Sequence, residues 1–321
     1  MYKKISQFFV LKSDKVCFKN SGFLRIFNGK EGKMYEFKEI VKNIYVMKAP
    51  FSIVWTGITL VRGEKNFLID SGAHAPEEYL IPALNKLGLE ITDIDYLLNT
   101  HCHGDHITGH NDIVTKYGIK TATYEGGVKA LTDPASNAVR IRTKFPEHSP
   151  APQSWLKGVK PDVILKDGEV LEDRLMVIST PGHDMDCVCW YDIPTKTAIT
   201  GDSLQGNGTP TQGVGFYQSL DAYESSVKKL YAYDIENLIL GHEYDGLGDF
   251  ILGKDKVKRA LDTCLEYTEK YGKLIASYVS EGMTDNAEIA KRLINEVGCG
   301  MPEKLFLPLY TVTEHRKKLG I

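Results

Sequence analysis

The sequence lacks several features that would assign it to a specialised class of protein. It has no uninterrupted apolar run of about 18 residues, so no transmembrane helix is expected. Its six cysteines in 321 residues are too sparse for a disulfide scaffold, and no two form a CxxC pair. The formal net charge of -3 argues against a surface built wholly for nucleic acid or anionic membranes. We therefore expect a soluble protein of the reducing cytoplasm, with no membrane span.

The first 33 residues differ in composition from the rest of the chain. They hold eight Lys or Arg against Asp14 and Glu31, a local net charge of +6, and five of the twelve phenylalanines. No apolar stretch there is long enough for a secretory signal. We interpret residues 1–33 as a basic, Phe-rich extension that is either poorly ordered or precedes an alternative start at Met34. An arm that docks on a membrane surface or a partner is the other interpretation.

From Met34 onward the hydrophobic pattern predicts a mixed α/β domain over 34–253, followed by a helical extension over 254–321. Three short apolar stretches punctuated by polar residues or glycine are typical of antiparallel strands: 43–49, 52–63 and 65–73. An amphipathic helix is expected over 76–88, ending at Gly88. Strands and helices then alternate. Residues 132–160 contain four prolines, and we expect a loop there that covers part of the molecule.

One short segment concentrates the histidines. Thr100–His110 has the sequence THCHGDHITGH and contains four of the chain's nine histidines together with Asp105. A single histidine is more often a core or surface residue than a ligand, but four in one loop indicate a metal site.

Further ligand candidates stand where other predicted strands end. Four buried strands are followed by a histidine or an aspartate, three of them directly after a glycine: His101, His183, Asp202 and His242. If these strands lie side by side, the side chains converge at one edge, and glycine allows the tight turn and close approach that this requires.

The residue types narrow the choice of metal. Imidazoles and carboxylates without thiolates suit Zn²⁺, with Fe or Mn as alternatives. Seven candidate ligands exceed one tetrahedral site and divide into two clusters with a shared carboxylate. His101 and His103 can point to one metal, and Asp105 and His106 to a second. Cys102, between them, is expected to point away.

These motifs resemble a known family. HxHxDH at His101–His106, TPGH at Thr180–His183, GD at Gly201–Asp202 and GH at Gly241–His242, in this order, resemble the metallo-β-lactamase superfamily. The resemblance covers roughly residues 37–250 and implies an α/β fold, the αββα four-layer sandwich. It also implies the ligand sets: His101, His103 and His183 for metal 1; Asp105, His106 and His242 for metal 2; Asp202 as the bridge; and Asp70 as a support behind the ligands.

The resemblance implies a hydrolase with two metal ions, of the glyoxalase II, lactonase or lactamase-beta-2 type. Two divalent ions about 3.5–4 Å apart would turn a bridging water into hydroxide and stabilise the leaving atom. Asp105 is the candidate catalytic residue, orienting that hydroxide and accepting its proton. No GxSxG motif or Ser-His-Asp arrangement competes with this chemistry.

Few residues bear on the substrate. The glycine-rich segment 206–217 ends in Phe216 and Tyr217, which either line a pocket or pack over the following helix. Tyr244 and His148 are weaker candidates for substrate contact. After His183 the sequence Asp184-Met185-Asp186 departs from the turn that is usual in glyoxalase II.

Three functions are compatible with these motifs. The leading hypothesis is hydrolysis of a small ester, thioester or lactone. The second is a phosphodiesterase or ribonuclease on the same site, and the third is a weakly catalytic metal-dependent binding or regulatory protein. The tail 254–321 is similar to the helical extension of lactamase-beta-2 type hydrolases, some of which cut single-stranded RNA. Its near-neutral charge does not favour nucleic acid as partner, and we expect it to pack over the site or to support a homodimer.

Overall fold

The N-terminal part of the computed structural model contains one pair of short strands. The structure describes residues 15–20, 23–28 and 35–321. β1 (Lys15–Asn20) and β2 (Phe23–Asn28) run antiparallel, with Lys15 opposite Asn28. The other residues of the basic extension, 1–14, 21–22 and 29–33, lie outside the described part. The interpretation of residues 1–33 as a whole therefore stays a prediction.

Residues 35–321 form a second unit, which begins with a seven-stranded sheet of order β3-β4-β5-β6-β7-β8-β9. The first four strands pair antiparallel and the last four pair parallel. Their bounds are Lys38–Val41, Ile44–Phe51, Val54–Val61, Phe67–Ile69, Tyr96–Leu98, Lys120–Tyr124 and Val163–Leu165. The antiparallel strands predicted over 43–73 are thereby confirmed.

A second, six-stranded sheet has the order β10-β11-β12-β13-β14-β15. Only β13 and β14 pair parallel, and the other neighbours pair antiparallel. The bounds are Val170–Leu171, Leu175–Ser179, Val188–Asp192, Thr197–Gly201, Asn237–Tyr244 and Gly248–Leu252. The sequence predicted that one strand ends before His242, but β14 continues through His242 to Tyr244. Its pairing with β15 is irregular between Ile239 and Tyr244.

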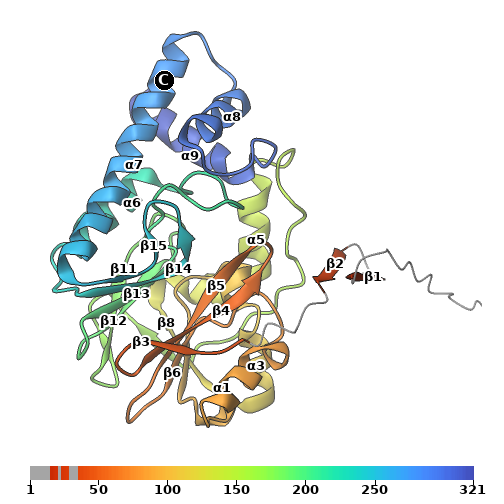
Figure 1. Ribbon diagram of the computed structural model, residues 1–321, viewed down its shortest axis with the longest axis vertical. Coiled ribbons are helices and arrows are strands. Elements are labelled where there is room, and N and C mark those ends of the chain that lie inside the picture. Colours follow the sequence, from red (N-terminus) through yellow and green to blue (C-terminus); the bar gives the residue numbers. More distant parts are fainter. Residues whose placement is uncertain (1–14, 21–22, 29–34) are drawn as a thin grey trace, which may run out of the picture. The chain divides into compact units, whose positions relative to one another are not determined.

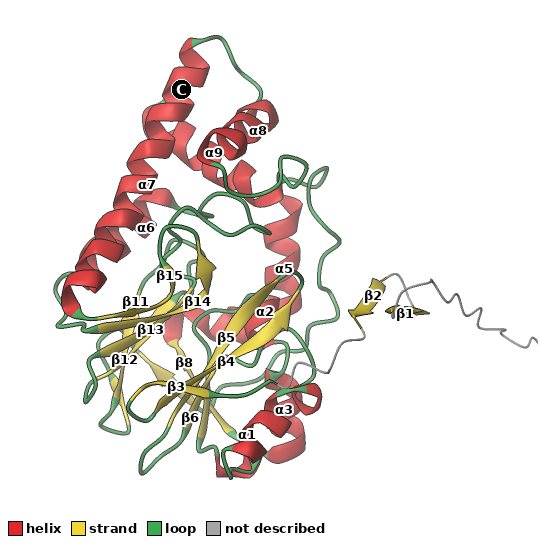
Figure 2. Ribbon diagram, in the orientation of Figure 1, coloured by secondary structure: helices red, strands yellow, loops and turns green. Residues whose placement is uncertain are grey.

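Helices cover the outer face of each sheet, which gives the four layers visible in Figures 1 and 2. Successive side chains of a strand point to opposite faces, and β6 shows the consequence. Phe67 and Ile69 pack in the core between the sheets, whereas Leu68 packs with α1 (Leu80–Lys86) and α3 (His110–Tyr117). On the far side, α6 (Leu220–Leu230) and α7 (Lys254–Ser280) cover the second sheet.

The C-terminal tail is helical, as predicted. It consists of α7 (Lys254–Ser280), α8 (Asn286–Val297) and α9 (Phe306–Leu319), at the upper end of the view in Figure 1. The side chain of Asp285 caps α8 by accepting a hydrogen bond from the Glu288 amide, which satisfies a donor that the helix itself leaves free. α7 begins at the predicted boundary, and the assignment of 254–321 as a separate extension stays a prediction.

The expectation of an irregular loop over 132–160 is wrong in its first part. α5 (Pro134–Thr143) occupies it, preceded by the short α4 (Val128–Thr132). The Asp133 carboxylate accepts a hydrogen bond from the Ser136 amide, and Pro134 stands at the first helical position. Proline is favoured there because its missing N–H would have no partner in the helix. The same residue that suggested a loop therefore begins a helix.

Candidate metal centre

The His-rich loop changes from extended to helical backbone halfway along its ligand candidates. After β7 the chain stays extended to His103, and α2 (Gly104–Ile107) then begins. His101 and His103 lie on the extended part, while Asp105 and His106 lie in the first turn of the helix. Asp105 and His106 therefore share a group that His101 and His103 do not, although His101 and His106 also meet at Asp202 in an overlapping third group.

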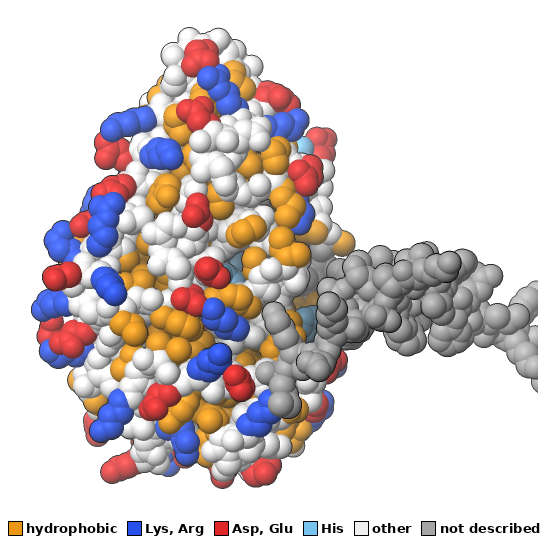
Figure 3. Space-filling view, viewed as in Figure 1, with side chains coloured by type: hydrophobic (Ala, Val, Ile, Leu, Met, Phe, Trp, Pro, Cys, Tyr) orange, Lys and Arg blue, Asp and Glu red, His pale blue; other side chains and the backbone are white. Residues whose placement is uncertain are grey.

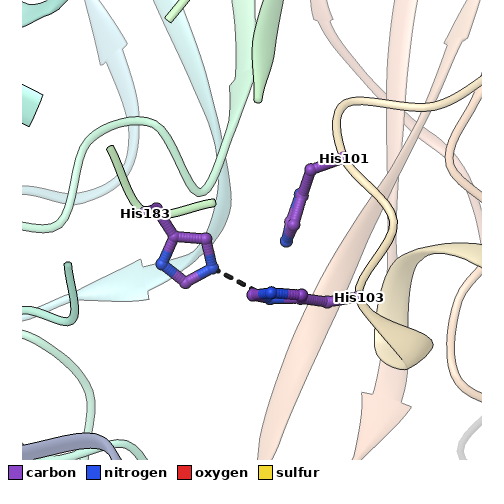
Figure 4. A group of neighbouring side chains, drawn as sticks. All are labelled: His101, His103 and His183. Carbon is purple, nitrogen blue, oxygen red and sulfur yellow. Dashed lines mark hydrogen bonds between the residues drawn. The ribbon is translucent and has the colours of Figure 1, made fainter. Parts of the chain in front are cut away.

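The first group contains His101, His103 and His183, whose side chains point toward one another in Figure 4. His183 Nε2 lies 3.0 Å from His103 Nδ1. The outer nitrogens have acceptors: the Phe216 carbonyl lies 3.2 Å from His183 Nδ1, and an Asp184 oxygen lies 3.1 Å from His103 Nε2.

These acceptors determine which nitrogens carry protons. A carbonyl or carboxylate oxygen can only accept, so each neutral ring places its N–H outward. The two inner nitrogens then face each other with lone pairs. A cation between them relieves this repulsion, and two ligands of a tetrahedral zinc ion are roughly 3.3 Å apart for bonds of about 2.05 Å. The donor set therefore fits a metal ion.

The second group contains Asp105, His106 and His242. His242 Nε2 lies 3.2 Å and His106 Nε2 lies 3.5 Å from the same Asp105 oxygen. Again each imidazole is fixed from outside. His106 Nδ1 donates to Asp70 at 2.8 Å, and His242 Nδ1 donates to the Trp55 carbonyl at 2.6 Å. Outer hydrogen bonds of this kind set the tautomer that metal-ligating histidines need.

Asp202 lies between the two groups. Its carboxylate is 3.4 Å from His106, His183 and His242, and 3.9 Å from His101. Within residues 35–321, three buried atoms of this cluster lack any hydrogen-bond partner: Nε2 of His101, Nε2 of His106 and Oδ1 of Asp202. Unsatisfied buried donors and acceptors are costly, and their convergence on one space is what a metal centre requires.

Glycine makes the approach of Asp202 possible. A Cβ on Gly241 would collide with the Asp202 carboxylate, and Gly201 adopts a φ of +49° directly before it. The close approach expected from the sequence at these two glycines is thus present.

The electrostatics of the cluster act differently on different ligands. Burial lowers the pKa of His183 to about 4, with His103 contributing, so its imidazole is neutral at pH 7. Burial alone would raise the pKa of Asp202, but His242 and His106 outweigh it and hold the pKa well below its ordinary value. Burial alone would lower the pKa of His242, but Asp202 and Asp105 outweigh it and raise the pKa to about 10, so this imidazole must release its proton when a divalent ion binds.

A cavity of about 210 Å³ opens onto this centre. His103, Asp105, His183, Asp202 and His242 form its floor. Its apolar wall comes from four parts of the chain, including the C-terminal tail: Phe51, Val54, Ala138, Ile141, Phe216, Phe306 and Leu307. The expectation that the tail packs near the site agrees with the positions of Phe306 and Leu307.

Of the four substrate candidates, only Phe216 lines this cavity. Tyr217 does not: it is fully buried in the core beside α6, with its ring 4.3 Å from that of Tyr223. Tyr244 is also buried, and its hydroxyl accepts a hydrogen bond from Gln205. His148 is exposed and is not part of the lining. These three residues are therefore poor candidates for substrate contact in this arrangement.

Comparison with known proteins identifies the family. A model of the Metallo-beta-lactamase superfamily matches residues 57–242, more than half of the chain and the whole ligand set. The chain belongs to the metallo-beta-lactamase superfamily. The predictions of this family, of its four-layer fold and of a metal-dependent hydrolase are confirmed.

Relatives within the superfamily are distant. The beta-lactamase-like protein 2 homolog of Caenorhabditis elegans is 27% identical over 236 residues, which are 72% of this chain and 68% of that protein. The hydroxyacylglutathione hydrolase of Pelagibacter ubique is 24% identical over 166 residues, 51% of this chain and 57% of the relative, little more than half its length. A metallo-beta-lactamase family protein from Thermus thermophilus shares the fold, with a TM-score of 0.67 and 21% identity over 88% of this chain and 95% of that one.

Asp70 supports this superfamily site from behind the ligands. Its carboxylate accepts hydrogen bonds of 2.8 Å from the Thr100 amide, the Thr100 hydroxyl and His106 Nδ1. Asp70 also has a φ of +65°, which few residues other than glycine, asparagine and aspartate tolerate. One residue thus fixes both the start of the His-rich loop and the orientation of His106.

We expect Asp70→Ala to destabilise the protein by about 2–4 kcal/mol, because it leaves buried donors unsatisfied. It should also weaken zinc binding roughly 10- to 100-fold, since His106 loses its orienting partner. Urea unfolding and zinc titration check both effects. Asp70→Asn is the control, because asparagine tolerates the positive φ and retains one acceptor. Unchanged zinc affinity in Asp70→Ala would contradict the role assigned to this carboxylate.

Asp184 contacts a candidate ligand, although the sequence shows it only as a departure from the usual turn. Its carboxylate is 3.1 Å from His103 Nε2 and is itself held by Arg140 at 3.1 Å. The same side chain accepts a hydrogen bond from the Met185 amide. An aspartate directly after a ligating histidine was the available signal. Its partner, 81 positions away, could be found only in the structure.

His110, the fourth histidine of the loop, is outside both groups. Its Nδ1 lies 2.8 Å from the Ser71 hydroxyl, and the side chain is 1% exposed. Burial lowers the pKa of His110 to about 3. It therefore remains neutral in the folded protein at pH values where the unfolded chain takes up a proton.

This difference predicts a pH-dependent stability. The unfolded imidazole titrates near pH 6.5, so the free energy of unfolding should fall as the pH drops from about 6.5 toward 3, by about 2 kcal/mol at pH 5 relative to pH 8. Unfolding of the wild type and of His110→Asn at both pH values isolates this contribution, with His148→Asn as the control at an exposed histidine. If His110→Asn shows the same loss between pH 8 and pH 5 as the wild type, burial of a neutral His110 is not its cause.

Proposed function

We propose that the chain is a dinuclear hydrolase of a small ester, thioester or lactone, with Zn²⁺ as the preferred metal. The observation that carries this proposal is the cavity over the cluster: it is small, its wall is largely apolar, and Arg142 is the only Lys or Arg among the described residues that line it. Small-molecule sites combine an apolar lining with a few polar groups in this way. The relatives named hydroxyacylglutathione hydrolase agree with an acyl substrate.

Two divalent ions in this cluster would supply an ionised water at neutral pH and would polarise the scissile carbonyl. His101, His103 and His183 would hold one ion, Asp105, His106 and His242 the other, and Asp202 would contact both. The apolar wall places the acyl group and excludes bulk water. Each imidazole is prevented from rotating by its outer hydrogen bond.

We propose that the Asp105 carboxylate is the protein group that orients the attacking water. It lines the cavity, and its Oδ2 lies 3.2 Å from His242 Nε2. Burial alone would raise the pKa of Asp105, but His106 and His242 hold it below its ordinary value. An ionised carboxylate at this position accepts a hydrogen bond from water and so orients the nucleophile toward the carbonyl.

A nucleic acid substrate is less well supported. A groove for single-stranded nucleic acid needs clustered cations interleaved with aromatic side chains. On the face drawn in Figure 3, Lys and Arg side chains alternate with Asp and Glu and do not gather by sign. The phosphodiesterase and binding-protein hypotheses, a homodimer and a cytoplasmic location stay predictions. None of the described helices has the length and hydropathy of a membrane span.

Turnover by the zinc- and manganese-loaded protein tests the proposal on a thioester, an aliphatic lactone, an aryl ester and an aryl phosphodiester. We expect hydrolysis of at least one acyl substrate and none of the phosphodiester. Hydrolysis of the phosphodiester alone would overturn the acyl assignment. No turnover at all, with two metals bound, would favour the binding-protein hypothesis.

A further inference from the structure

Helix α5 carries two arginines with different surroundings. Arg140 is paired: its guanidinium lies 3.1 Å from Asp184 and donates to Gln218 at 2.8 Å. Arg142 lines the cavity over the metal centre and is half-buried. Its only hydrogen bond within residues 35–321 runs from Nη2 to Gln153 Oε1 at 3.2 Å, and its buried Nε has no partner there.

The position of Gln153 connects this arginine to the His-rich loop. Gln153 also lines the cavity, and its amide packs so closely on Gly104 that a Cβ there would collide with it. Gly104 is the first residue of α2, directly between His103 and Asp105. Arg142 and Gln153 thus form one polar corner of the cavity beside the metal ligands. The other lining residues outside the ligand set are uncharged, and the polar ones among them are Asn137, Thr209, Thr211 and Gln212.

An unpaired, partly buried guanidinium is unfavourable without a ligand. Burial removes water from a charge and leaves N–H donors unsatisfied. The Asp105 carboxylate attracts this charge, but no carboxylate in the described part of the chain forms an ion pair with Arg142. Arginine offers parallel N–H groups that match the two oxygens of a carboxylate. A substrate carboxylate would satisfy both requirements.

We propose that Arg142 and Gln153 form a subsite for a carboxylate of the substrate, so that the preferred substrate is an anionic ester or thioester with a mainly apolar body. This inference rests on the proposed acyl hydrolysis and specifies its substrate class. The carboxylate belongs to either the acyl group or the leaving group, and the two positions are separated by experiment.

Matched thioesters test the subsite. One pair places a terminal carboxylate or the isosteric carboxamide on a hexanoyl group with a neutral thiol. The second pair places the carboxylate or carboxamide on the thiol, with a neutral hexanoyl group. We expect the wild type to prefer the carboxylate in one pair by roughly 10- to 100-fold in kcat/KM, the range of a charge-assisted hydrogen bond.

Variants of Arg142 test whether this residue causes the preference for the carboxylate. Arg142→Met should reduce the carboxylate preference to within about twofold, whatever its effect on absolute turnover, and Arg142→Lys should give an intermediate preference. Arg259→Gln is the matched control, because Arg259 pairs with Glu266 on α7 and does not line the cavity. Absence of a carboxylate preference in both pairs, or its persistence in Arg142→Met, would overturn the inference.

A binding measurement separates this inference from the proposed function. Hexanedioate and its monoamide are titrated into the metal-loaded wild type and Arg142→Met by calorimetry. If no thioester is hydrolysed but the wild type still binds hexanedioate more tightly, and Arg142→Met does not, the subsite stands and acyl hydrolysis fails. If thioesters are hydrolysed while both proteins bind the two compounds equally, the subsite fails and the hydrolase stands.

Discussion

Replacement of Asp202 by alanine should abolish turnover and reduce metal binding in both groups of ligands. Asp202 is the one carboxylate within 4 Å of four of the six other ligand candidates. Its loss leaves a buried set of imidazoles without the charge that offsets two cations. The metals would stabilise the transition state by several kcal/mol, and this stabilisation is lost with them. We therefore expect kcat to fall by about a thousandfold or more.

Metal analysis and kinetics on the same preparation check this result. We expect fewer than two bound zinc ions per chain in Asp202→Ala after gel filtration, against two in the wild type. Asp112→Ala is a suitable control, because Asp112 is a partly exposed residue of α3 that pairs with Lys116. An Asp202→Ala protein that keeps two zinc ions and wild-type turnover would show that this carboxylate does not bridge the site.

The second large effect is expected for Asp105→Asn. The change preserves shape but removes the negative charge that faces His106 and His242. We expect kcat to fall by roughly 100- to 10,000-fold, because the attacking water loses its acceptor, and the second metal to bind more weakly. The first group of ligands does not include Asp105, so one zinc ion should remain tightly bound.

The same variant separates chemistry from folding. Asp105 is partly exposed at the floor of the cavity, so its replacement should preserve the fold. The thermal unfolding temperature of the metal-loaded protein should fall only by the stabilisation that the second metal supplied. Asp112→Asn again provides the matched control. Turnover at the wild-type rate in Asp105→Asn would contradict the role assigned to this carboxylate. A much larger fall in the unfolding temperature would show that the variant loses activity because its fold is disturbed.

The candidate metal ligands could be identified from the sequence because several of them follow predicted strands. Asp202 directly follows β13, and His101 and His183 come within four residues of the ends of β7 and β11. β7 belongs to the first sheet and β11 and β13 to the second, so the ligands meet across the two sheets and not along one edge. His242 was found for the same reason, although β14 continues past it. The residues that hold the ligands from outside were harder to predict. Asp70 came from the family resemblance, and Asp184 and the Trp55 carbonyl required the three-dimensional structure.

The residues that line the cavity were predicted less well than the candidate metal ligands, for a different physical reason. Phe216 and Tyr217 are neighbours in the irregular segment before α6, and their side chains point to different sides: Phe216 lines the cavity, and Tyr217 packs in the core. The sequence identifies the pair but not which member faces the cavity, and Tyr217 faces the core. Arg142 was missed because α5 was expected to be a loop. Without the helix, nothing placed this arginine beside Asp105.

The central claim is that one cluster binds two metal ions that act together in hydrolysis. Stepwise addition of Zn²⁺ to the metal-free protein tests it most directly, with bound zinc measured by calorimetry and thioester turnover measured on the same samples. The account predicts two zinc ions per chain, with full turnover only after the second has bound, and loss of the second binding step in Asp105→Asn. Saturation of both binding and turnover by a single zinc ion would contradict it.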